Sequence, residues 1–189
     1  MSNMKIKREI MDAAAISRSL DRIALEIVEQ NSGTDNLALV GIHTGGVPLA
    51  HRLQKRIAQS GGGEVKVGMI DITLYRDDAF IGLPQPIVGK TELPFRVTGH
   101  RLVLVDDVLY TGRTIRAALD ALIDFGRPRC IQLAVLVDRG HREFPIQPDY
   151  VGKTVQTDSD ESVQVVLQEL STESDRAYIQ TRTDTKDSL

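Results

Sequence analysis

The residues with the clearest chemical potential lie between Leu102 and Thr114. An apolar run from Leu102 to Val105 is followed by the carboxylates Asp106 and Asp107 and then by a Thr-Gly-Arg-Thr loop. This order predicts a buried strand, an acidic tip and a loop that opens a helix, where free N–H groups favour an anion. The two carboxylates would repel the phosphate itself, so they suit neutral hydroxyl groups or a metal beside it. Because a phosphate next to a diol is a ribose 5-phosphate, the segment is a candidate phosphoribosyl site.

Simpler interpretations exist for each piece of this segment. An Asp-Asp pair at a strand end is often a solvated turn or the acidic pocket of a receiver domain. The loop alone is often no more than a helix N-cap, supplied here by Thr111 or Thr114. The complete order of strand, acid pair, loop and helix is more specific than either piece, and a receiver domain gives the loop no role.

Composition favours an α/β protein. The chain has 189 residues, of which 41% are hydrophobic and only 4% aromatic, with no Trp. An aliphatic core of this kind is typical of a parallel sheet covered by helices. We expect a single domain over residues 1–183 and a frayed polar tail over 184–189. The net charge of −3 gives no general attraction to nucleic acid.

The single cysteine and the ends of the chain bear on location. Cys130 stands at the head of an apolar strand, excludes an internal disulfide and is expected to be a buried structural thiol. No apolar run reaches membrane length, and residues 1–7 lack a signal-peptide core. We therefore expect a cytoplasmic protein with no membrane partner.

Hydrophobic periodicity predicts alternating helices and strands, and hence a right-handed parallel sheet. The first helix, residues 12–30, shows an apolar face made of Ile16, Leu20, Ile23, Leu25, Ile27 and Val28. The second covers residues 47–59, and the third has a face from Ile115 to Ile123 and is ended by Gly126 and Pro128. The predicted strands are residues 37–42, 65–74 (or two strands joined near 69), 101–105, 131–137, 150–152 and 163–167.

Two loops are expected to carry ligand groups. His43-Thr44-Gly45-Gly46 follows one buried strand as the acid-pair loop follows another, so both should lie at one edge of the sheet. Residues 76–92 hold Gly and Pro without periodicity, which is typical of a lid, a binding loop or a disordered segment. No Walker A segment or dinucleotide fingerprint is present.

With these residues in view, the chain resembles the family of pyrimidine operon regulators that are also uracil phosphoribosyltransferases, within the type I phosphoribosyltransferase superfamily. The resemblance covers nearly the whole chain. Its motifs are D-I-T-L-Y-R-D-D (71–78), V-D-D-V-L-Y-T-G-R-T (105–114), G-R-P (126–128) and V-L-V-D-R-G-H-R-E (135–143). It implies a central parallel sheet with helices on both sides and a small hood over the base.

The resemblance implies that the chain makes UMP and pyrophosphate from uracil and phosphoribosyl pyrophosphate. It also implies a role for individual residues in this reaction. Asp106 and Asp107 would hold the ribose hydroxyls, with Mg²⁺ bridging ribose and pyrophosphate oxygens nearby. Thr44 and Gly45 would lie at the pyrophosphate, with Gly45 in place of the family's Arg. Asp138 and Arg139 would lie near uracil, and residues 76–92 would close over the site. The implied catalytic residues are Asp106, Asp107 and Arg139, and the implied substrate-binding residues are Thr44, Gly45, Arg76, Asp106, Asp107, Val108, Leu109, Tyr110, Thr111, Gly112, Arg113, Thr114, Val137, Asp138, Arg139 and Val163.

Such a transfer needs positioning and electrostatics rather than a protein nucleophile. The sequence accordingly shows no Ser-His-Asp or Cys-His arrangement. His141 is the nearest candidate general base, although a surface or RNA-facing role fits it equally. The remaining histidines, His43, His51 and His100, are scattered and make no metal cluster.

The resemblance also implies binding of UMP or UTP, a homodimer or homotetramer, and uridine-nucleotide-dependent binding to a leader RNA. An RNA-binding attenuation regulator with little enzymatic role is the alternative function. The RNA-facing residues kept here are Arg18, Arg22, His141, Arg142 and Lys153. However, Asp21, Leu25 and Gln147 stand where RNA-binding members usually carry Thr, His and Arg. An Asp repels phosphates and a lost Arg removes a bidentate donor, so we expect weak RNA binding.

Overall fold

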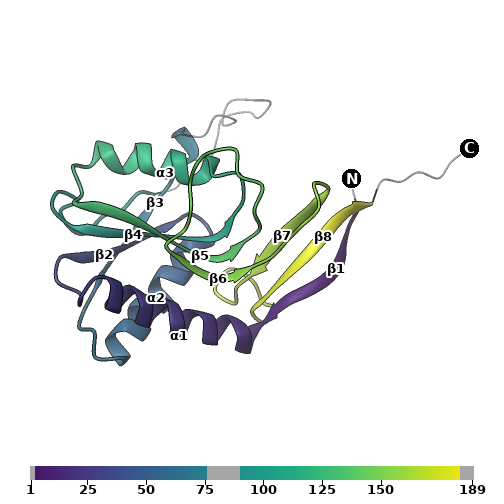
Figure 1. Cartoon of the computed structure of the whole chain (residues 1–189), viewed down its shortest axis with the longest axis horizontal. Coiled ribbons are helices and arrows are strands. Elements are labelled where there is room, and N and C mark those ends of the chain that lie inside the picture. The colour runs from purple at the N-terminus through teal and green to yellow at the C-terminus, as the bar shows by residue number, and fades with distance from the viewer. Residues whose placement is uncertain (1–2, 76–89, 184–189) are drawn as a thin grey trace, which may run out of the picture.

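The computed structural model describes residues 3–75 and 90–183 and contains two sheets (Figure 1). The larger sheet is parallel, with strand order β3-β2-β4-β5-β6. Its strands are β2 (Leu37–Ile42), β3 (Lys66–Ile70), β4 (Arg101–Leu109), β5 (Cys130–Asp138) and β6 (Tyr150–Thr154). The predicted parallel α/β architecture is confirmed.

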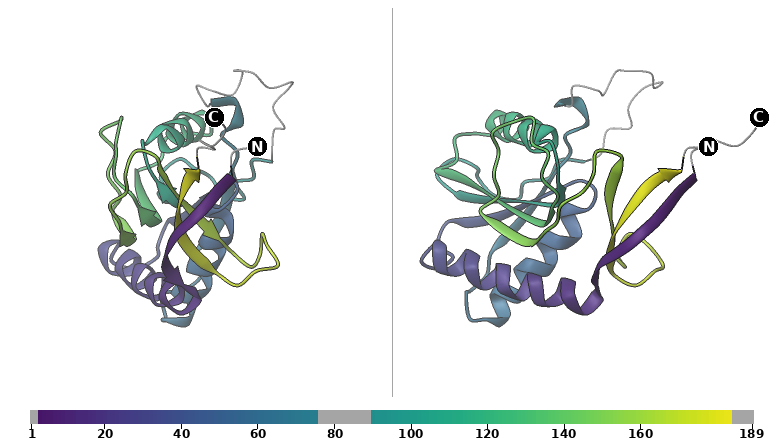
Figure 2. Two further views of the ribbon diagram at one scale, coloured as in Figure 1. Left: turned by 90° about the vertical axis from the view of Figure 1, so that its right-hand side faces the viewer. Right: turned by 45° about the vertical axis from the view of Figure 1, so that its right-hand side comes forward.

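Helices cover both faces of this sheet (Figure 2). The helices α1 (Ala13–Gln30) and α2 (Gly46–Gln59) lie on one face, and α3 (Arg113–Asp124) lies on the other. Alternate residues of β4 enter the two cores: Val103 packs with α1 and α2, whereas Leu102 and Leu104 pack with α3. Burial on both faces explains why the strands read as continuous apolar runs.

The first helix begins where the sequence predicts. Asp12 is its N-cap, and the Asp12 carboxylate accepts a 2.7 Å hydrogen bond from the backbone N–H of Ala15. Ile16, Leu20 and Ile23 are buried, but Leu25 is 57% exposed, so its assignment to the apolar face was wrong. At 100° per residue, position 25 lies about 200° around the helix from position 23, on the solvent side.

A smaller antiparallel sheet, the hood, stands beside the main sheet. It consists of β1 (Asn3–Asp12), β8 (Arg176–Thr183) and β7 (Glu161–Val166), in that order. The chain passes directly from β1 into α1, which ties the hood to the main sheet (Figure 1). The sequence predicted β7 but neither β1 nor β8.

Two further predictions require correction. The strand predicted over residues 65–74 ends at Ile70, because Asp71 accepts a 2.6 Å hydrogen bond from the Thr73 N–H and a 3₁₀ turn (Thr73–Tyr75) follows. Cys130 is exposed rather than buried. It is the first residue of β5, whose buried stretch begins only at Leu133, so the thiol lies beyond the cover of the helices.

Parts of the expected organisation lie outside the described residues. These are the tail 184–189 and nearly all of the loop 76–92, including Arg76. Over the described ranges, no helix is long and apolar enough to cross a bilayer.

Candidate phosphoribosyl site

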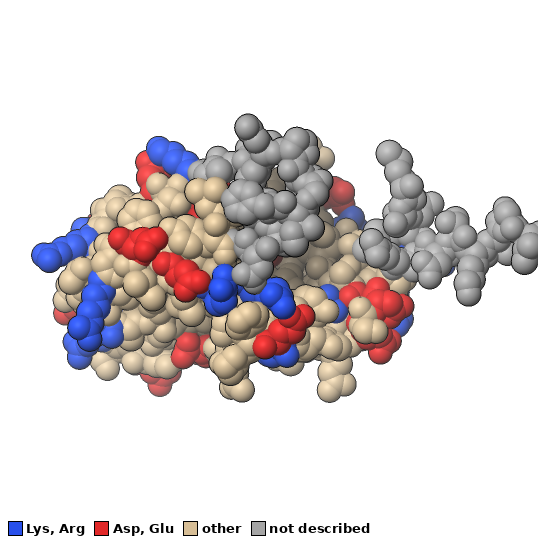
Figure 3. Space-filling view, turned by 90° about the horizontal axis from the view of Figure 1, so that it is seen from above, with Lys and Arg blue, Asp and Glu red and all other residues tan. Residues whose placement is uncertain are grey.

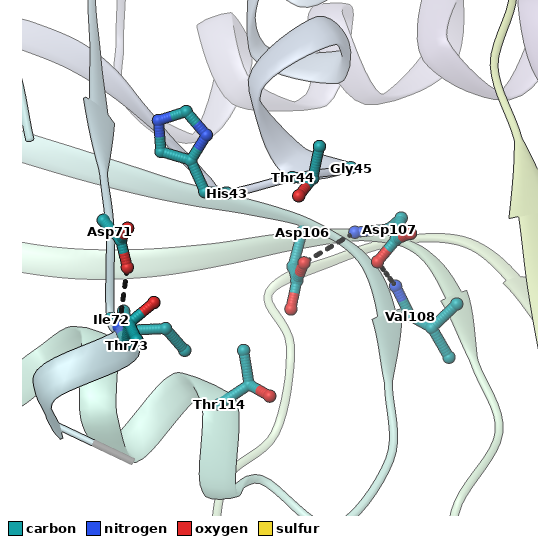
Figure 4. Close-up of a pocket in the computed structure, with 10 residues that line it drawn as sticks. All are labelled: His43, Thr44, Gly45, Asp71, Ile72, Thr73, Asp106, Asp107, Val108 and Thr114. Carbon is teal, nitrogen blue, oxygen red and sulfur yellow. Dashed lines mark hydrogen bonds between the residues drawn. The ribbon is translucent and has the colours of Figure 1, made fainter. Parts of the chain in front are cut away.

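The order of the strands creates a crevice at one edge of the main sheet. From β2 the chain crosses through α2 to β3 on one side, and from β4 it crosses through α3 to β5 on the other. Where neighbouring strands send their connections in opposite directions, their carboxyl ends leave a crevice for ligands. A cleft of about 480 Å³ lies here (Figure 4). Its described lining residues are His43, Thr44, Gly45, Asp71, Ile72, Thr73, Asp106, Asp107, Val108 and Thr114.

The acid pair lies near the carboxyl end of β4, inside the strand rather than beyond it. Asp106 is only 6% exposed, and its carboxylate accepts a 3.0 Å hydrogen bond from the Asp107 N–H. Asp107 accepts a 2.8 Å hydrogen bond from the Val108 N–H. Burial, together with repulsion from Asp107, raises the pKa of Asp106 well above its ordinary value, and burial also raises the pKa of Asp107. Both groups are therefore harder to ionise than a free aspartate, and hydroxyl donors or a cation beside them would favour the carboxylate form.

The start of α3 forms the opposite wall of the cleft. Its N-cap is Gly112, in a left-handed conformation (φ +92°), and no side chain caps the helix in the described structure. Neither Thr111 nor Thr114 is the N-cap of the simpler interpretation; the Thr111 hydroxyl accepts a long 3.3 Å bond from the Arg113 N–H. An uncapped helix start with a hydroxyl at Thr114 favours a phosphate.

The loop after β2 approaches β4 closely. A Cβ atom on Gly46 would lie 2.0 Å from the carbonyl oxygen of Val105, and one on Gly45 would lie 2.4 Å from Oδ2 of Asp107. Both positions therefore require glycine in this arrangement. A side chain at position 45 would therefore require the Asp107 side chain to move.

The segment from Asp138 to Ile146 supports residues 110–114, the candidate phosphate loop, from outside. The backbone N–H groups of Glu143 and Phe144 both donate to the carbonyl of Thr111. Arg142 donates to the Tyr110 and Ile146 carbonyls and pairs with the Asp138 carboxylate at 2.7 Å. These bonds give the V-D-R-G-H-R-E motif a structural role, because they hold the candidate phosphate loop in place.

Arg139 connects this loop to the hood. It is 5% exposed, and its guanidinium carbon lies 3.9 Å from the centre of the Tyr110 ring. Its Nη2 donates to the Glu161 carbonyl at 2.7 Å and its Nε to Thr157 at 3.2 Å. Stacking and hydrogen bonding together fix the hood relative to the phosphate loop.

The arrangement can hold a phosphate at one end and neutral hydroxyl groups at its centre. A family model described as "Phosphoribosyl transferase domain" matches residues 7–169. The chain is 61% identical to "Bifunctional protein PyrR" of Thermus aquaticus, over 90% of this chain and 94% of that protein. It is also 61% identical to the protein of the same name from Pelotomaculum thermopropionicum, over 88% and 92%. The chain belongs to the PyrR family.

Solved structures support the fold of this PyrR-family chain. A hypoxanthine-guanine phosphoribosyltransferase from Bacillus anthracis superposes with a TM-score of 0.69 at 17% identity, over 95% of this chain and 99% of that one. At this identity the likeness concerns the fold alone, and it agrees with the type I architecture that the motifs implied.

The structure brings only some of the predicted site residues to the cleft. Thr44, Gly45, Asp106, Asp107, Val108 and Thr114 line it. Leu109 and Val137 have side chains buried in the core, and Val163 packs against the core. Arg139 binds the hood as described above, and the Asp138 carboxylate is engaged by Arg142 and by the Gly140 N–H.

The predicted RNA-facing residues fall into two groups. Arg18, Arg22 and Lys153 line a separate cleft of about 430 Å³ between α1 and β6. Arg142 is instead bonded to the phosphate loop, and His141 Nε2 lies 2.7 Å from the Thr157 carbonyl oxygen.

Four lining residues of the cleft were not among the implied substrate-binding residues: His43, Asp71, Ile72 and Thr73, although His43 belongs to a loop that was expected to carry ligand groups. A signal for two of them was present, because His43 and Asp71 each follow an apolar strand directly, as Asp106 does. Polar residues at the carboxyl ends of parallel strands converge on the same edge.

Proposed function

We propose that this chain is a uracil phosphoribosyltransferase, which joins N1 of uracil to the anomeric carbon of phosphoribosyl pyrophosphate. The products are UMP and pyrophosphate. The observation that carries the proposal is the convergence of an uncapped helix start and a buried acid pair in one cleft of a PyrR-family chain.

Residues along the cleft would bind successive parts of the substrate. The start of α3 and Thr114 would bind the 5-phosphate, Asp106 and Asp107 the ribose hydroxyls, and Thr44 the pyrophosphate. As the bond from the anomeric carbon to pyrophosphate breaks and the bond to N1 forms, positive charge develops on the ribose. Carboxylates fixed beside the ribose in a buried site stabilise that charge without reorganising. Holding both reactants in line supplies the remaining advantage.

The donor chemistry of the cleft fits magnesium that arrives with the substrate. Within residues 3–75 and 90–183, no group of three or more His, Cys, Asp or Glu side chains could hold a metal. Mg²⁺ is typically held by one or two carboxylates, substrate phosphates and water. Asp106 and Asp107 would lie beside the ion, which when bound supplies positive charge to the pyrophosphate.

The enzymatic proposal is tested by substrate choice. Purified protein is given Mg²⁺, phosphoribosyl pyrophosphate and each nucleobase in turn, and pyrophosphate release is measured. We expect release with uracil and not with hypoxanthine, guanine or adenine. Pyrophosphate release with a purine only would contradict the proposal. So would the lack of release with every base tested.

A second function, binding of a pyrimidine leader RNA with a uridine nucleotide, is favoured by one observation. The cleft between α1 and β6 gathers three cationic side chains, from Arg18, Arg22 and Lys153. Filter retention of a leader hairpin with UMP or UTP measures this activity independently of catalysis. Retention that needs the nucleotide would support it, and absence of retention at low salt would oppose it.

A further inference from the structure

Three arginines lie at the edge of the main sheet opposite the crevice, in the loops that lead into β4 and β5. This edge is at the end of the sheet farther from the hood (Figure 1), and Lys and Arg side chains protrude there on the left of Figure 3. Arg96, Arg127 and Arg129 are exposed, and no carboxylate within residues 3–75 and 90–183 pairs with them. These three guanidinium groups are therefore available to a negatively charged partner.

Backbone hydrogen bonds hold the two loops together. The Gly99 N–H donates to the Arg127 carbonyl at 3.0 Å. The Arg129 N–H donates to the His100 carbonyl at 2.8 Å. Pro128, the last residue of the G-R-P motif, restricts its own backbone and that of Arg127. The arginines thus project from a backbone that is already ordered, which lowers the entropy lost when a partner binds.

An exposed aromatic ring belongs to the same loop as two of the arginines. Phe125 is the residue at which α3 ends, and it is 52% exposed. Phe125, Arg127 and Arg129 stand at alternate positions of this loop. An exposed ring offers a face on which a base can stack, and guanidinium groups bind phosphates. Unstacked bases and phosphates occur together in a single-stranded nucleic acid, so this combination fits such a strand.

Carboxylates near this edge leave the positive charge of the three arginines unbalanced. On α3, the Asp124 carboxylate accepts a hydrogen bond from the Tyr75 hydroxyl, and Asp120 lies 3.6 Å from Arg116. Asp35 is exposed in the turn before β2, and its backbone carbonyl accepts a 2.8 Å hydrogen bond from Nη2 of Arg101. The charge of Asp35 is thus offset by that of a fourth arginine beside it.

We propose that a single-stranded nucleic acid binds to the amino-edge surface, which consists of Arg96, Phe125, Arg127 and Arg129. The guanidinium groups bind successive phosphates, and Phe125 stacks on one base. Because neither contact reads the edge of a base, binding does not depend on sequence. The amino-edge surface shares no residue with the crevice or with the cleft between α1 and β6, so it is independent of the proposed reaction and of leader binding.

The proposal is tested by the binding of an oligo(A) strand of about 12 nucleotides, made as RNA and as DNA and followed by fluorescence anisotropy. Oligo(A) contains no uracil, so it resembles neither the proposed base nor the proposed product. Each phosphate contact to a single strand contributes about −0.7 to the slope of log affinity against log salt concentration. Three contacts predict a wild-type affinity that falls about 20-fold between about 50 and 200 mM salt. Tighter binding of one of the two strands identifies RNA or DNA as the partner.

Two variants assign the binding to this surface. The variant Arg96→Gln, Arg127→Gln and Arg129→Gln should bind at least about tenfold more weakly at low salt and lose most of the salt dependence. Phe125→Leu keeps an apolar side chain but removes the ring, so its affinity should fall about fivefold or more with an unchanged salt slope.

A matched control removes three exposed cations from β1 and α2 by the changes Lys5→Gln, Arg8→Gln and Lys55→Gln. It should bind oligo(A) within about twofold of the wild type, and thermal melts should show that all the variants are folded. Equal affinity of the wild type and the triple arginine variant would overturn the proposal. So would equal competition by inorganic polyphosphate combined with unchanged binding by Phe125→Leu, because the surface would then bind anions in general. Absence of uracil turnover by the wild type would count against the proposed function and leave this result unaffected.

Discussion

At the scale of single residues, the site is built from groups held in unfavourable states. Asp106 is buried beside another carboxylate, and Gly112 occupies a backbone region that other residues rarely adopt. Both features reduce stability on their own and position groups for a ligand. Substitutions at such residues separate stability from activity.

Asp106→Asn should stabilise the fold while impairing the enzyme. Because the pKa of Asp106 is raised in the folded state, its contribution to stability is fully present below the ordinary aspartate pKa and is lost as pH rises through the folded pKa. The amide can still accept the bond from Asp107 N–H without ionising. At pH 8 the melting temperature should exceed that of the wild type, by ~2–4 °C for each kcal/mol added to the free energy of unfolding. This difference in melting temperature should disappear towards pH 4.

Turnover efficiency of Asp106→Asn should fall at least about tenfold, the value of one charged hydrogen bond. Asp107→Asn is the control for burial, because Asp107 is the less buried of the two and its substitution should change the melting temperature less. Unchanged kinetics in both variants would remove the ribose assignment.

Gly112→Ala should damage the phosphate loop, whereas Gly99→Ala should not. Both glycines have positive φ angles, +92° and +84°, so each alanine costs ~1–2 kcal/mol in backbone strain. A Cβ on Gly112 would also lie 3.2 Å from Cβ of Phe144, while one on Gly99 would meet nothing within 4 Å. Thermal melts should show similar losses for the two variants, but kinetics should show a fall in kcat/KM for phosphoribosyl pyrophosphate of about tenfold or more only for Gly112→Ala. Gly112→Val should be inactive; turnover by that variant would place the phosphate elsewhere.

At the scale of elements, the phosphate loop depends on a segment that contributes nothing to the lining of the cleft. Arg142 donates to the Tyr110 carbonyl across this contact and to the Gly140 and Ile146 carbonyls within its own segment, and it is paired with Asp138. Arg142→Met keeps the aliphatic volume and removes these bonds.

We expect Arg142→Met to lower the free energy of unfolding by at least ~1.5–3 kcal/mol, the value of one charged hydrogen bond. The KM for phosphoribosyl pyrophosphate should also rise several-fold, because the loop loses its support. Arg18→Met is the control, since Arg18 is exposed on α1 and lies in the other cleft. Denaturant melts and steady-state kinetics measure both effects, and equal behaviour of the two variants would contradict the structural role.

The elements differ in how far the sequence predicts them. Strands β2 and β4 are buried on both faces, so their apolar runs identify them directly. Strands β1 and β8 are not, because the hood is a small sheet and β1 carries Lys5, Lys7 and Glu9 along an exposed face. The partners of Arg139 and Arg142 are also invisible in the sequence, since they lie up to 32 residues away along the chain.

At the scale of the whole molecule, charge is mixed rather than concentrated. On the face in Figure 3, Lys and Arg side chains are interspersed with Asp and Glu. Asp21 pairs with Arg56 at 2.7 Å, and Leu25 and Gln147 are exposed. These three positions are therefore open to a large partner.

The triple variant Asp21→Thr, Leu25→His and Gln147→Arg should bind a pyrimidine leader hairpin more tightly than the wild type. It removes one carboxylate and adds one guanidinium per chain. Each charged hydrogen bond gained with the RNA is worth ~1.5–3 kcal/mol. Because phosphate contacts set the salt dependence, its affinity should fall more steeply with salt. Filter binding with a uridine nucleotide measures both, and tight nucleotide-dependent binding by the wild type would contradict the expectation of weak RNA binding.

The pairing of the first strand of the sequence, β1, with the last, β8, sets an order of assembly during synthesis. Asn3 lies opposite Thr183 in the hood, so β1 cannot complete its pairing until residues up to Thr183 have emerged from the ribosome. The parallel sheet is complete once β6 has been made, at Thr154. Closing a connection of this length is entropically costly and slow compared with pairing neighbouring strands. A nascent chain can therefore form the crevice with its acid pair first, and the hood that Arg139 holds against Tyr110 is the last part to fold.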